Sequence, residues 1–170
     1  MSDYTPLRVA ESSIQDVEAL WLYERAKEMD SIVELGCFQG KSSHALLSGC
    51  RGQVFCIDHF KGSTDVNDAT HGKSGKKEFL SNCGEFAHLR LIELDTVLAA
   101  DLFADKTIDM IFIDAGHLHN EVLADLTAWA PKCKKLLCGH DFTHPSVRQA
   151  LIDRNYDATV ACATIWEVRL

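Results

Sequence analysis

Two hydrophobic periodicities alternate along the chain. Short apolar segments predict strands over 31–35, 53–58, 89–94, 108–114 and 135–139, and several of them are continuous apolar runs, which are typical of strands buried on both faces. Between these runs, apolar residues recur every three or four positions, which predicts helices over 42–47, 76–82, 97–103, 119–129 and 145–154. A further helix is expected before the first strand, capped by Ser12 or Ser13 and continuing through Ala26.

Alternating strands and helices predict an α/β fold with a parallel sheet, right-handed crossovers and helices on both faces. The last two apolar segments, 158–163 and 164–170, are too close together for a helical crossover, so they predict a C-terminal antiparallel hairpin. The 170 residues, 46% of them hydrophobic, fit one domain over 1–170 with an N-terminal helical segment over 1–30. The expected sheet is mostly parallel and seven-stranded.

One stretch, 60–75, has no regular pattern. A loop of this length is uncommon in a compact domain, and such loops often form lids or bind ligands. The sequence alone is equally consistent with a simple surface insertion. We therefore expect either a lid or substrate loop, or an insertion without a role in binding.

The segment 31–44 has the pattern of a strand, a tight glycine turn and a helix start. Glu34 ends the apolar run, Gly36 begins the turn, and Gly40 precedes the expected helix. Glycine allows a ligand to approach the backbone, and a helix start presents unpaired N–H groups. The glycine spacing differs from that of a dinucleotide fingerprint and of a phosphate loop. An ordinary strand-to-helix turn is the alternative interpretation.

An acidic residue lies at or just beyond the end of each of the five expected parallel strands. These residues are Glu34, Asp58, Asp95, Asp114 and Asp141. In open α/β sheets, ligands bind outside the carboxyl ends of the strands. Because crowded carboxylates repel one another, cations, hydroxyls or amines are expected to neutralise or hydrogen-bond them.

Charge and composition narrow the classes of function. The formal net charge of −8 argues against a nucleic-acid-binding surface. The seven cysteines form no C-x-x-C pair, which argues against a disulfide framework or a zinc cage. Without a long apolar run or a signal pattern, a cytoplasmic protein with no membrane partner is expected.

Three further motifs carry a specific resemblance. They are the run from Asp109 to His117, the pattern V-x-x-D-x-x-x-W from Val122 to Trp129, and Gly139-His140-Asp141-Phe142 followed by Val147. With the glycine turn, they resemble class I S-adenosylmethionine-dependent methyltransferases of the methyltransferase domain 24 family. The resemblance covers about Ile32 to Arg148 and implies a Rossmann-like domain.

The resemblance implies a cofactor site at the strand ends. Gly36, Cys37, Phe38 and Gly40 would pass along the methionine part of S-adenosylmethionine, and Glu34 would orient the loop or the amino group. A carboxylate with two acceptor oxygens at Asp58 suits the ribose hydroxyls. His59 and Phe60 would flank the adenine, Asp95 would lie near the adenine amine, and Asp114 would also contact the cofactor.

Methyl transfer from a sulfonium needs mainly positioning, with a base or a metal ion to help deprotonate a hydroxyl. His117 lies three residues beyond Asp114, where related O-methyltransferases carry a catalytic lysine, so the expected catalytic residues are His117 and Asp114. The alternative is that His117 caps the helix that begins near His119. Asp114, His140 and Asp141 are also candidate ligands for a divalent metal, although Phe142 replaces an oxygen ligand of cation-dependent relatives.

The expected function is therefore S-adenosylmethionine-dependent O-methylation of a small-molecule acceptor. The alternatives are a non-catalytic S-adenosylmethionine-binding module and, with less support from the glycine spacing, a nicotinamide-dependent oxidoreductase. Because no second domain is available to form the acceptor site, the 60–75 loop, the N-terminal helix or a neighbouring subunit must supply it. A homodimer is one expectation on that ground.

Overall fold

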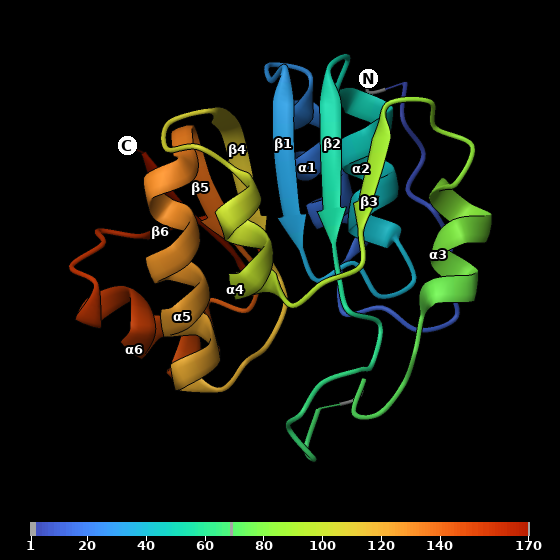
Figure 1. Cartoon of the computed structure of the whole chain (residues 1–170). Helices are drawn as coiled ribbons and strands as arrows, with labels where there is room; N and C mark the ends of the chain where they lie inside the picture. Colours follow the sequence, from blue (N-terminus) through green and yellow to red (C-terminus); the bar gives the residue numbers. More distant parts are fainter. Residues whose placement is uncertain (1–2, 69, 170) are drawn as a thin grey trace.

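Seven strands form one sheet in the computed structural model, which describes residues 3–68 and 70–169 (Figure 1). They are β1 (Ser31–Leu35), β2 (Gln53–Ile57), β3 (Leu89–Ile92), β4 (Ile108–Ile113), β5 (Cys133–Gly139), β6 (Thr159–Cys162) and β7 (Ile165–Arg169). Their order is β3-β2-β1-β4-β5-β7-β6; β7 is antiparallel to both of its neighbours, and the other four strand pairs are parallel. The predicted mostly parallel sheet with a C-terminal hairpin is confirmed.

The helices cover both faces of this sheet. On one face lie α1 (Asp16–Ala26), α2 (Lys41–Gly49) and α3 (Lys76–Cys83), and on the other lie α4 (Thr96–Ala99), α5 (His119–Trp129) and α6 (Pro145–Asp153) (Figure 1). Adjacent strand residues point to opposite cores: Ile32 packs in the first and Val33 in the second. Strands buried on both sides account for the continuous apolar runs.

Two local predictions are wrong. The first helix begins at Asp16 after Gln15 and not after Ser12 or Ser13, because the Glu18 carboxylate accepts a hydrogen bond from the Gln15 N–H at 2.8 Å. The helix expected over 97–103 is a single α-helical turn, α4, followed by a 3-10 turn at Ala100–Leu102. None of the helices within 3–68 and 70–169 is both long and apolar enough to cross a membrane.

The topology brings the strand ends together. β1 pairs with β2 on one side and with β4 on the other, so the chain order reverses at β1 and leaves a crevice beyond the strand ends. All five parallel strands end at the same edge of the sheet. The 60–75 loop lies beyond this edge, at the bottom of Figure 1.

Candidate active site

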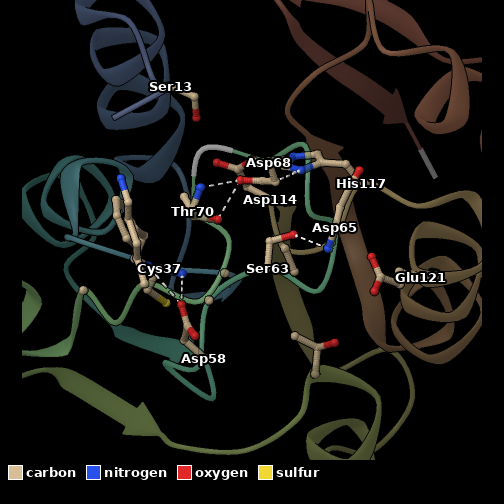
Figure 2. A pocket seen from close by; sticks show the side chains of 18 of the residues that line it. Ser13, Cys37, Asp58, Ser63, Asp65, Asp68, Thr70, Asp114, His117 and Glu121 are labelled. Atoms are coloured by element: carbon tan, nitrogen blue, oxygen red, sulfur yellow. Dashed lines mark hydrogen bonds and ion pairs between the residues drawn. The ribbon is translucent and has the colours of Figure 1, made fainter. Parts of the chain in front are cut away.

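A cavity of about 890 Å³ opens at this edge (Figure 2). Its walls are formed by the glycine loop after β1, the ends of β2 and β4, residues 11–14 of the N-terminal segment and much of the 60–75 loop. Three residues of its lining, Phe38, Phe60 and Asp141, have positive φ angles of 44°, 53° and 57° although they are not glycines. Backbone strain of this kind is concentrated at functional sites.

The glycine loop packs tightly against the end of β4. Gly36 has a φ of +82°, and a Cβ atom there would lie 2.1 Å from the backbone oxygen of Asp114. Gly40, with a φ of +87°, immediately precedes α2, and it also lines the cavity. A side chain at Gly36 is therefore excluded both by the close approach and by the backbone conformation.

Asp58 holds the glycine loop in place. Its Oδ2 accepts hydrogen bonds from the N–H groups of Cys37 at 2.8 Å and Phe38 at 3.0 Å, and its Oδ1 accepts one from Phe60 at 2.6 Å (Figure 2). A carboxylate has about four lone-pair sites, so Oδ1 keeps capacity for a ligand donor. The expected cofactor residues Cys37, Phe38 and Asp58 are thus brought together.

Glu34 lies behind the loop and not in the cavity lining. Its side chain is fully buried, and its carboxylate accepts hydrogen bonds from the hydroxyl of Ser43 at 2.5 Å and the thiol of Cys56 at 3.4 Å. Burial raises the pKa of Glu34 to about 7. All seven cysteines are free, and Cys37 and Cys56 form a buried cluster with Glu34 beneath the loop.

His59 and Asp95 line the side of the cavity beyond β2 and β3. The His59 Nδ1 accepts a hydrogen bond from the N–H of Lys61 at 3.0 Å, and the Asp95 carboxylate caps α4 by accepting hydrogen bonds from Val97 and Leu98. Asp95 therefore both caps α4 and lines the cavity.

Asp125 is a cavity-lining carboxylate to which the sequence analysis assigned no role. The Thr96 hydroxyl donates a hydrogen bond to it at 2.5 Å, and the Trp129 indole donates one to the Thr96 carbonyl at 2.9 Å. Asp125 is buried, and burial raises its pKa to about 7. The V-x-x-D-x-x-x-W motif therefore joins α5 to α4. This motif contains Asp125, so it could have identified the residue from the sequence.

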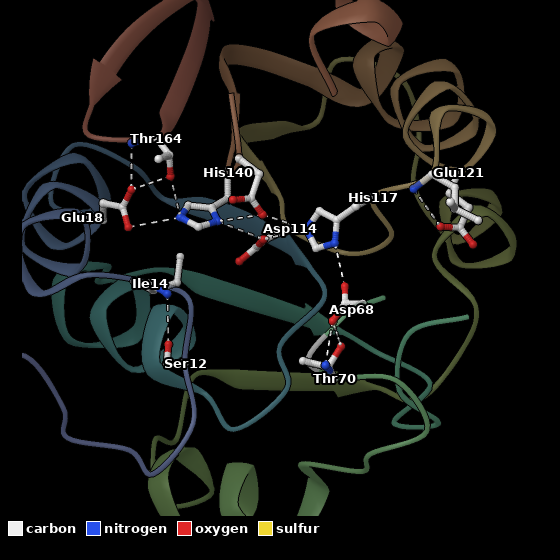
Figure 3. Close-up of polar contacts among 12 residues, drawn as sticks. Ser12, Ile14, Glu18, Asp68, Thr70, Asp114, His117, Glu121, His140 and Thr164 are labelled. Atoms are coloured by element: carbon white, nitrogen blue, oxygen red, sulfur yellow. Dashed lines mark hydrogen bonds and ion pairs between the residues drawn. The ribbon is translucent and has the colours of Figure 1, made fainter. Parts of the chain in front are cut away.

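Two carboxylates and two imidazoles meet at the ends of β4 and β5 (Figure 3). Nε2 of His117 lies 2.9 Å from Oδ2 of Asp141 and 3.9 Å from Oδ1 of Asp114. Nδ1 of His140 lies 3.3 Å and 3.5 Å from the same two oxygens. We call these four residues the His–Asp cluster; all four are among the candidate site residues named from the sequence.

The outer nitrogen of each ring has a carboxylate partner of its own. Nδ1 of His117 lies 2.8 Å from Oδ2 of Asp68 in the 60–75 loop, and Nε2 of His140 lies 3.1 Å from Oε2 of Glu18 in α1 (Figure 3). The Thr164 hydroxyl is a further partner of His140 at 2.8 Å. No sequence motif marked these three outer partners.

The helix-cap interpretation of His117 does not hold. Helix α5 follows Leu118, whose N–H donates to the Glu121 carboxylate at 3.3 Å, whereas the His117 ring faces Asp68 and the cluster carboxylates. The sequence also missed the Trp166 indole, which donates to the His140 carbonyl at 3.0 Å. This contact uses the space left by Gly139, where a Cβ atom would lie 2.4 Å from the Trp166 ring.

Mutual attraction shifts the pKa values within the cluster. The Asp114 and Asp141 carboxylates raise the pKa of His117 to about 11 against the effect of burial. Burial lowers the pKa of His140, but Asp114, Asp141 and Glu18 outweigh it and raise that pKa to about 12. Burial also opposes the charge of Asp141, yet the two rings hold its pKa well below the ordinary value.

Comparison with known proteins places the chain in a family. The family model described as "Methyltransferase domain" matches residues 33–142, which is more than half of the chain. No curated protein sequence matches the chain.

Solved structures share the fold at low sequence identity. The O-methyltransferase NovP has a TM-score of 0.73 at 14% identity, with 95% of this chain and 82% of that chain covered. The O-methyltransferase from Bacillus cereus in complex with SAH has a TM-score of 0.63 at 14% identity, with 93% and 83% covered. The SAH-bound Podospora anserina methyltransferase PaMTH1 has a TM-score of 0.66 at 13% identity, with 92% and 79% covered. Because the family model matches most of the chain and includes both the glycine loop and the ends of β4 and β5, the chain belongs to this methyltransferase-domain family.

Proposed function

We propose that the protein transfers the methyl group of S-adenosylmethionine to an oxygen of a small-molecule acceptor. The observation that carries this proposal is the glycine loop, which Asp58 holds against the end of β4 at the edge of a cavity. The His–Asp cluster lies at the other end of the opening. The bound SAH in two similar methyltransferases supports the choice of cofactor.

The cofactor would lie along the strand ends. Gly36, Cys37, Phe38 and Gly40 follow its methionine part, and Asp58 uses its remaining acceptor capacity for the ribose hydroxyls. His59 and Asp95 lie on the wall where the adenine is expected. Glu34 supports the loop from beneath through Ser43 in α2, and Asp114 faces the reacting group.

Methyl transfer requires the acceptor oxygen in line with the breaking carbon–sulfur bond. The oxygen forms a bond to the methyl carbon while the sulfur leaves as S-adenosylhomocysteine, and the hydroxyl proton passes to the Asp114 carboxylate. Both nitrogens of His117 already face carboxylates, at 2.8 Å and 2.9 Å. We therefore assign His117 the role of holding Asp114 and Asp141 in position, in place of the base suggested by its sequence position.

The residues present fit a divalent metal ion. Asp114, His140 and Asp141 offer donor atoms within 4.8 Å of one another, and the buried Nδ1 of His140 has no hydrogen-bond partner among the described residues. When bound, such an ion would lower the pKa of the acceptor hydroxyl. Asp114 and Asp141 would supply oxygen ligands, and His140 would supply nitrogen.

The 60–75 loop is proposed as the lid over the acceptor. Three of its contacts reach different parts of the molecule: Thr64 donates to Glu121 at 2.6 Å, Lys73 pairs with Glu11 at 3.0 Å, and Asp68 pairs with His117. These contacts connect the loop to α5, to the N-terminal segment and to the cluster. A homodimer that completes the acceptor site remains part of the proposal.

Calorimetric titration tests the cofactor directly. We expect S-adenosylmethionine and S-adenosylhomocysteine to bind. NAD should give no measurable heat of binding. Binding of NAD alone would contradict the proposal and favour an oxidoreductase. S-adenosylhomocysteine release with a panel of hydroxyl-bearing small molecules then separates an enzyme from a binding module, since a module binds the cofactor without turnover.

A further inference from the structure

We propose that Asp125 selects the adenine base of the cofactor, because its protonated carboxyl donates a hydrogen bond from Oδ2 to a ring nitrogen of that base. This role rests on the proposed function, since it requires the S-adenosyl group in the cavity. It adds a specificity-determining residue on α5 to the residues already placed along the cofactor.

Asp125 reaches the cavity from α5 although almost all of its surface is buried. Only 2% of the residue is exposed, yet it belongs to the cavity lining. Among the described residues, one hydrogen bond reaches its side chain: the Thr96 hydroxyl donates to Oδ1 at 2.5 Å. A carboxyl group has a second oxygen. Oδ2 is therefore left for a group inside the cavity.

The surroundings of Asp125 favour its protonated form. Asp95, which precedes α4, and Glu121, one turn earlier on α5, both oppose a negative charge there. No lysine, arginine or histidine among residues 3–68 and 70–169 forms an ion pair with Asp125. A buried carboxylate without a cation is strongly disfavoured, and such a group takes up a proton instead. Burial accordingly raises the pKa of Asp125 to about 7.

The order of the strands places this carboxyl beside the base. In the proposed function, the glycine loop after β1 takes the methionine part, and Asp58 after β2 takes the ribose. Because β3 is the next strand in the sheet, the base lies beyond its end, where Asp95 and Thr96 line the cavity. Thr96 is the residue whose hydroxyl contacts Asp125.

The surface around the carboxyl suits a purine base. Val97, which follows Thr96, and Ala124, which precedes Asp125, also line the cavity. Their apolar side chains suit the faces of an aromatic ring, and the carboxyl suits its polar edge. Adenine offers ring nitrogens that accept hydrogen bonds and an amine that donates them. A protonated carboxyl both donates and accepts, whereas a carboxylate only accepts.

The proton on Oδ2 makes cofactor affinity depend on pH. Because the bound base holds this proton, binding is strongest while Asp125 is protonated and weakens as the pH rises through about 7. Each further pH unit lowers the affinity by up to about tenfold, which is the effect of one pKa unit. A carboxylate that only joins α5 to α4 through Thr96 would leave the affinity constant.

Calorimetric titration of the full chain with S-adenosylhomocysteine from pH 6 to pH 8.5 measures this dependence. For the unmodified chain, we expect the affinity to fall about 10–30-fold across this range. Asp125→Asn keeps the shape and replaces the O–H donor with an N–H donor that does not titrate. Its affinity should stay within about threefold of the unmodified chain at pH 6 and remain constant to pH 8.5.

Two further variants of this contact separate the donor from its surroundings. Asp125→Leu has no donor, so its affinity at pH 6 should be about tenfold lower and independent of pH. Thr96→Val removes a hydrogen bond that lowers the pKa of Asp125, so the affinity should begin to fall at a higher pH. Thermal unfolding at pH 6 shows whether each variant is folded under the conditions of the titration.

Other titratable residues on the same wall supply the controls. In His59→Gln the pH dependence should persist, whatever the affinity. In Asp95→Asn it should persist and shift to lower pH, because a negative charge that raises the pKa of Asp125 is gone. A pH dependence that survives in Asp125→Asn, or that disappears in His59→Gln, would assign the titrating group elsewhere and overturn the role of Asp125.

Analogues of the ligand identify the atom of the base. In three analogues of S-adenosylhomocysteine, a C–H group replaces N1, N3 or N7 of adenine. One of them should bind the unmodified chain about tenfold more weakly at pH 6 and show no such loss with Asp125→Leu. Equal losses in the two proteins for all three analogues would contradict a hydrogen bond from Asp125.

The same titrations distinguish this role from the proposed function. No binding of S-adenosylhomocysteine to the unmodified chain at pH 6 would reject both. Binding that is unchanged between pH 6 and pH 8.5 would reject the role of Asp125 and leave the cofactor assignment standing.

Discussion

The two ends of the cavity hold their carboxylates in different ways. At the end with the glycine loop, which we propose holds the cofactor and call the cofactor end, Asp58 is fixed by three backbone N–H groups, two of them from the loop. At the His–Asp cluster, Asp114 and Asp141 face side chains whose outer partners come from α1 and the 60–75 loop. Backbone donors persist when neighbouring side chains change, so the cofactor end should tolerate substitutions that disrupt the cluster.

The largest expected effect is the loss of stability when Glu18, the buried partner of His140 in the cluster, is replaced. Glu18→Ala leaves His140 without its buried carboxylate, and breaking a buried pair costs about 3–5 kcal/mol of unfolding free energy. Urea denaturation measures the loss. Glu24→Ala on the same helix is the control, since its pairing with Lys27 is exposed and is worth less than about 1 kcal/mol. Equal losses in both variants would contradict the importance of the buried pair.

The next largest effect is the loss of cofactor affinity when Gly36 at the cofactor end is replaced. In Gly36→Ala, the new Cβ atom meets the Asp114 backbone oxygen at 2.1 Å, so the loop must move and S-adenosylmethionine affinity should fall at least 100-fold, about 2.7 kcal/mol. Calorimetry measures this change. Gly72→Ala also has a positive φ, but no atom lies within 4 Å of its new Cβ. Its cofactor affinity should therefore change little; a matching loss would show that backbone strain, and not the contact with β4, is responsible.

A smaller effect is expected from the charge of Asp58. Asp58→Asn keeps the shape but weakens the acceptor for the loop N–H groups and the ribose, so cofactor affinity should fall by about 1–3 kcal/mol. Asp65→Asn makes the same charge change at a loop residue of the cavity. Titration of both variants should give a clear loss only for Asp58→Asn. An unchanged affinity would remove Asp58 from the cofactor site.

The last effect is a change in the pH dependence of stability at Asp125. The folded protein keeps the Asp125 proton up to a pKa of about 7, whereas the unfolded chain loses it near the ordinary value of 3.8. The unfolded state therefore binds fewer protons between these values, and the contribution of Asp125 to stability is present below pH 4 and lost as the pH rises through 7.

Asp125→Asn removes this dependence. Relative to the unmodified chain, the variant should gain stability as the pH rises from 4 to 7, by up to about 4 kcal/mol, because each pKa unit corresponds to about 1.4 kcal/mol. Thermal unfolding across this range measures the difference. A constant difference between the two proteins would show that Asp125 does not titrate as the burial implies.

The cofactor end was largely predictable because its parts are close together in sequence. Glu34, Gly36 and Gly40 belong to one strand-to-helix turn, and the ends of the parallel strands must meet at one edge. Even here, the sequence left open whether Glu34 orients the loop or the cofactor's amino group, and it did not predict that Asp58 binds the loop N–H groups. Those details depend on how the turn packs against its neighbours.

The hydrophobic pattern by itself determined the sheet and its two covered faces. Because the acidic residues follow the predicted strands directly, it also placed them at one edge of the sheet. This follows because burial requires an apolar run wherever a strand is covered on both sides. Only the tertiary structure decided that Glu18, Asp68 and Thr164 surround the two histidines. These polar residues have no periodicity that marks them, and the chain brings them together only when α1, the 60–75 loop and the C-terminal hairpin have packed around the ends of β4 and β5.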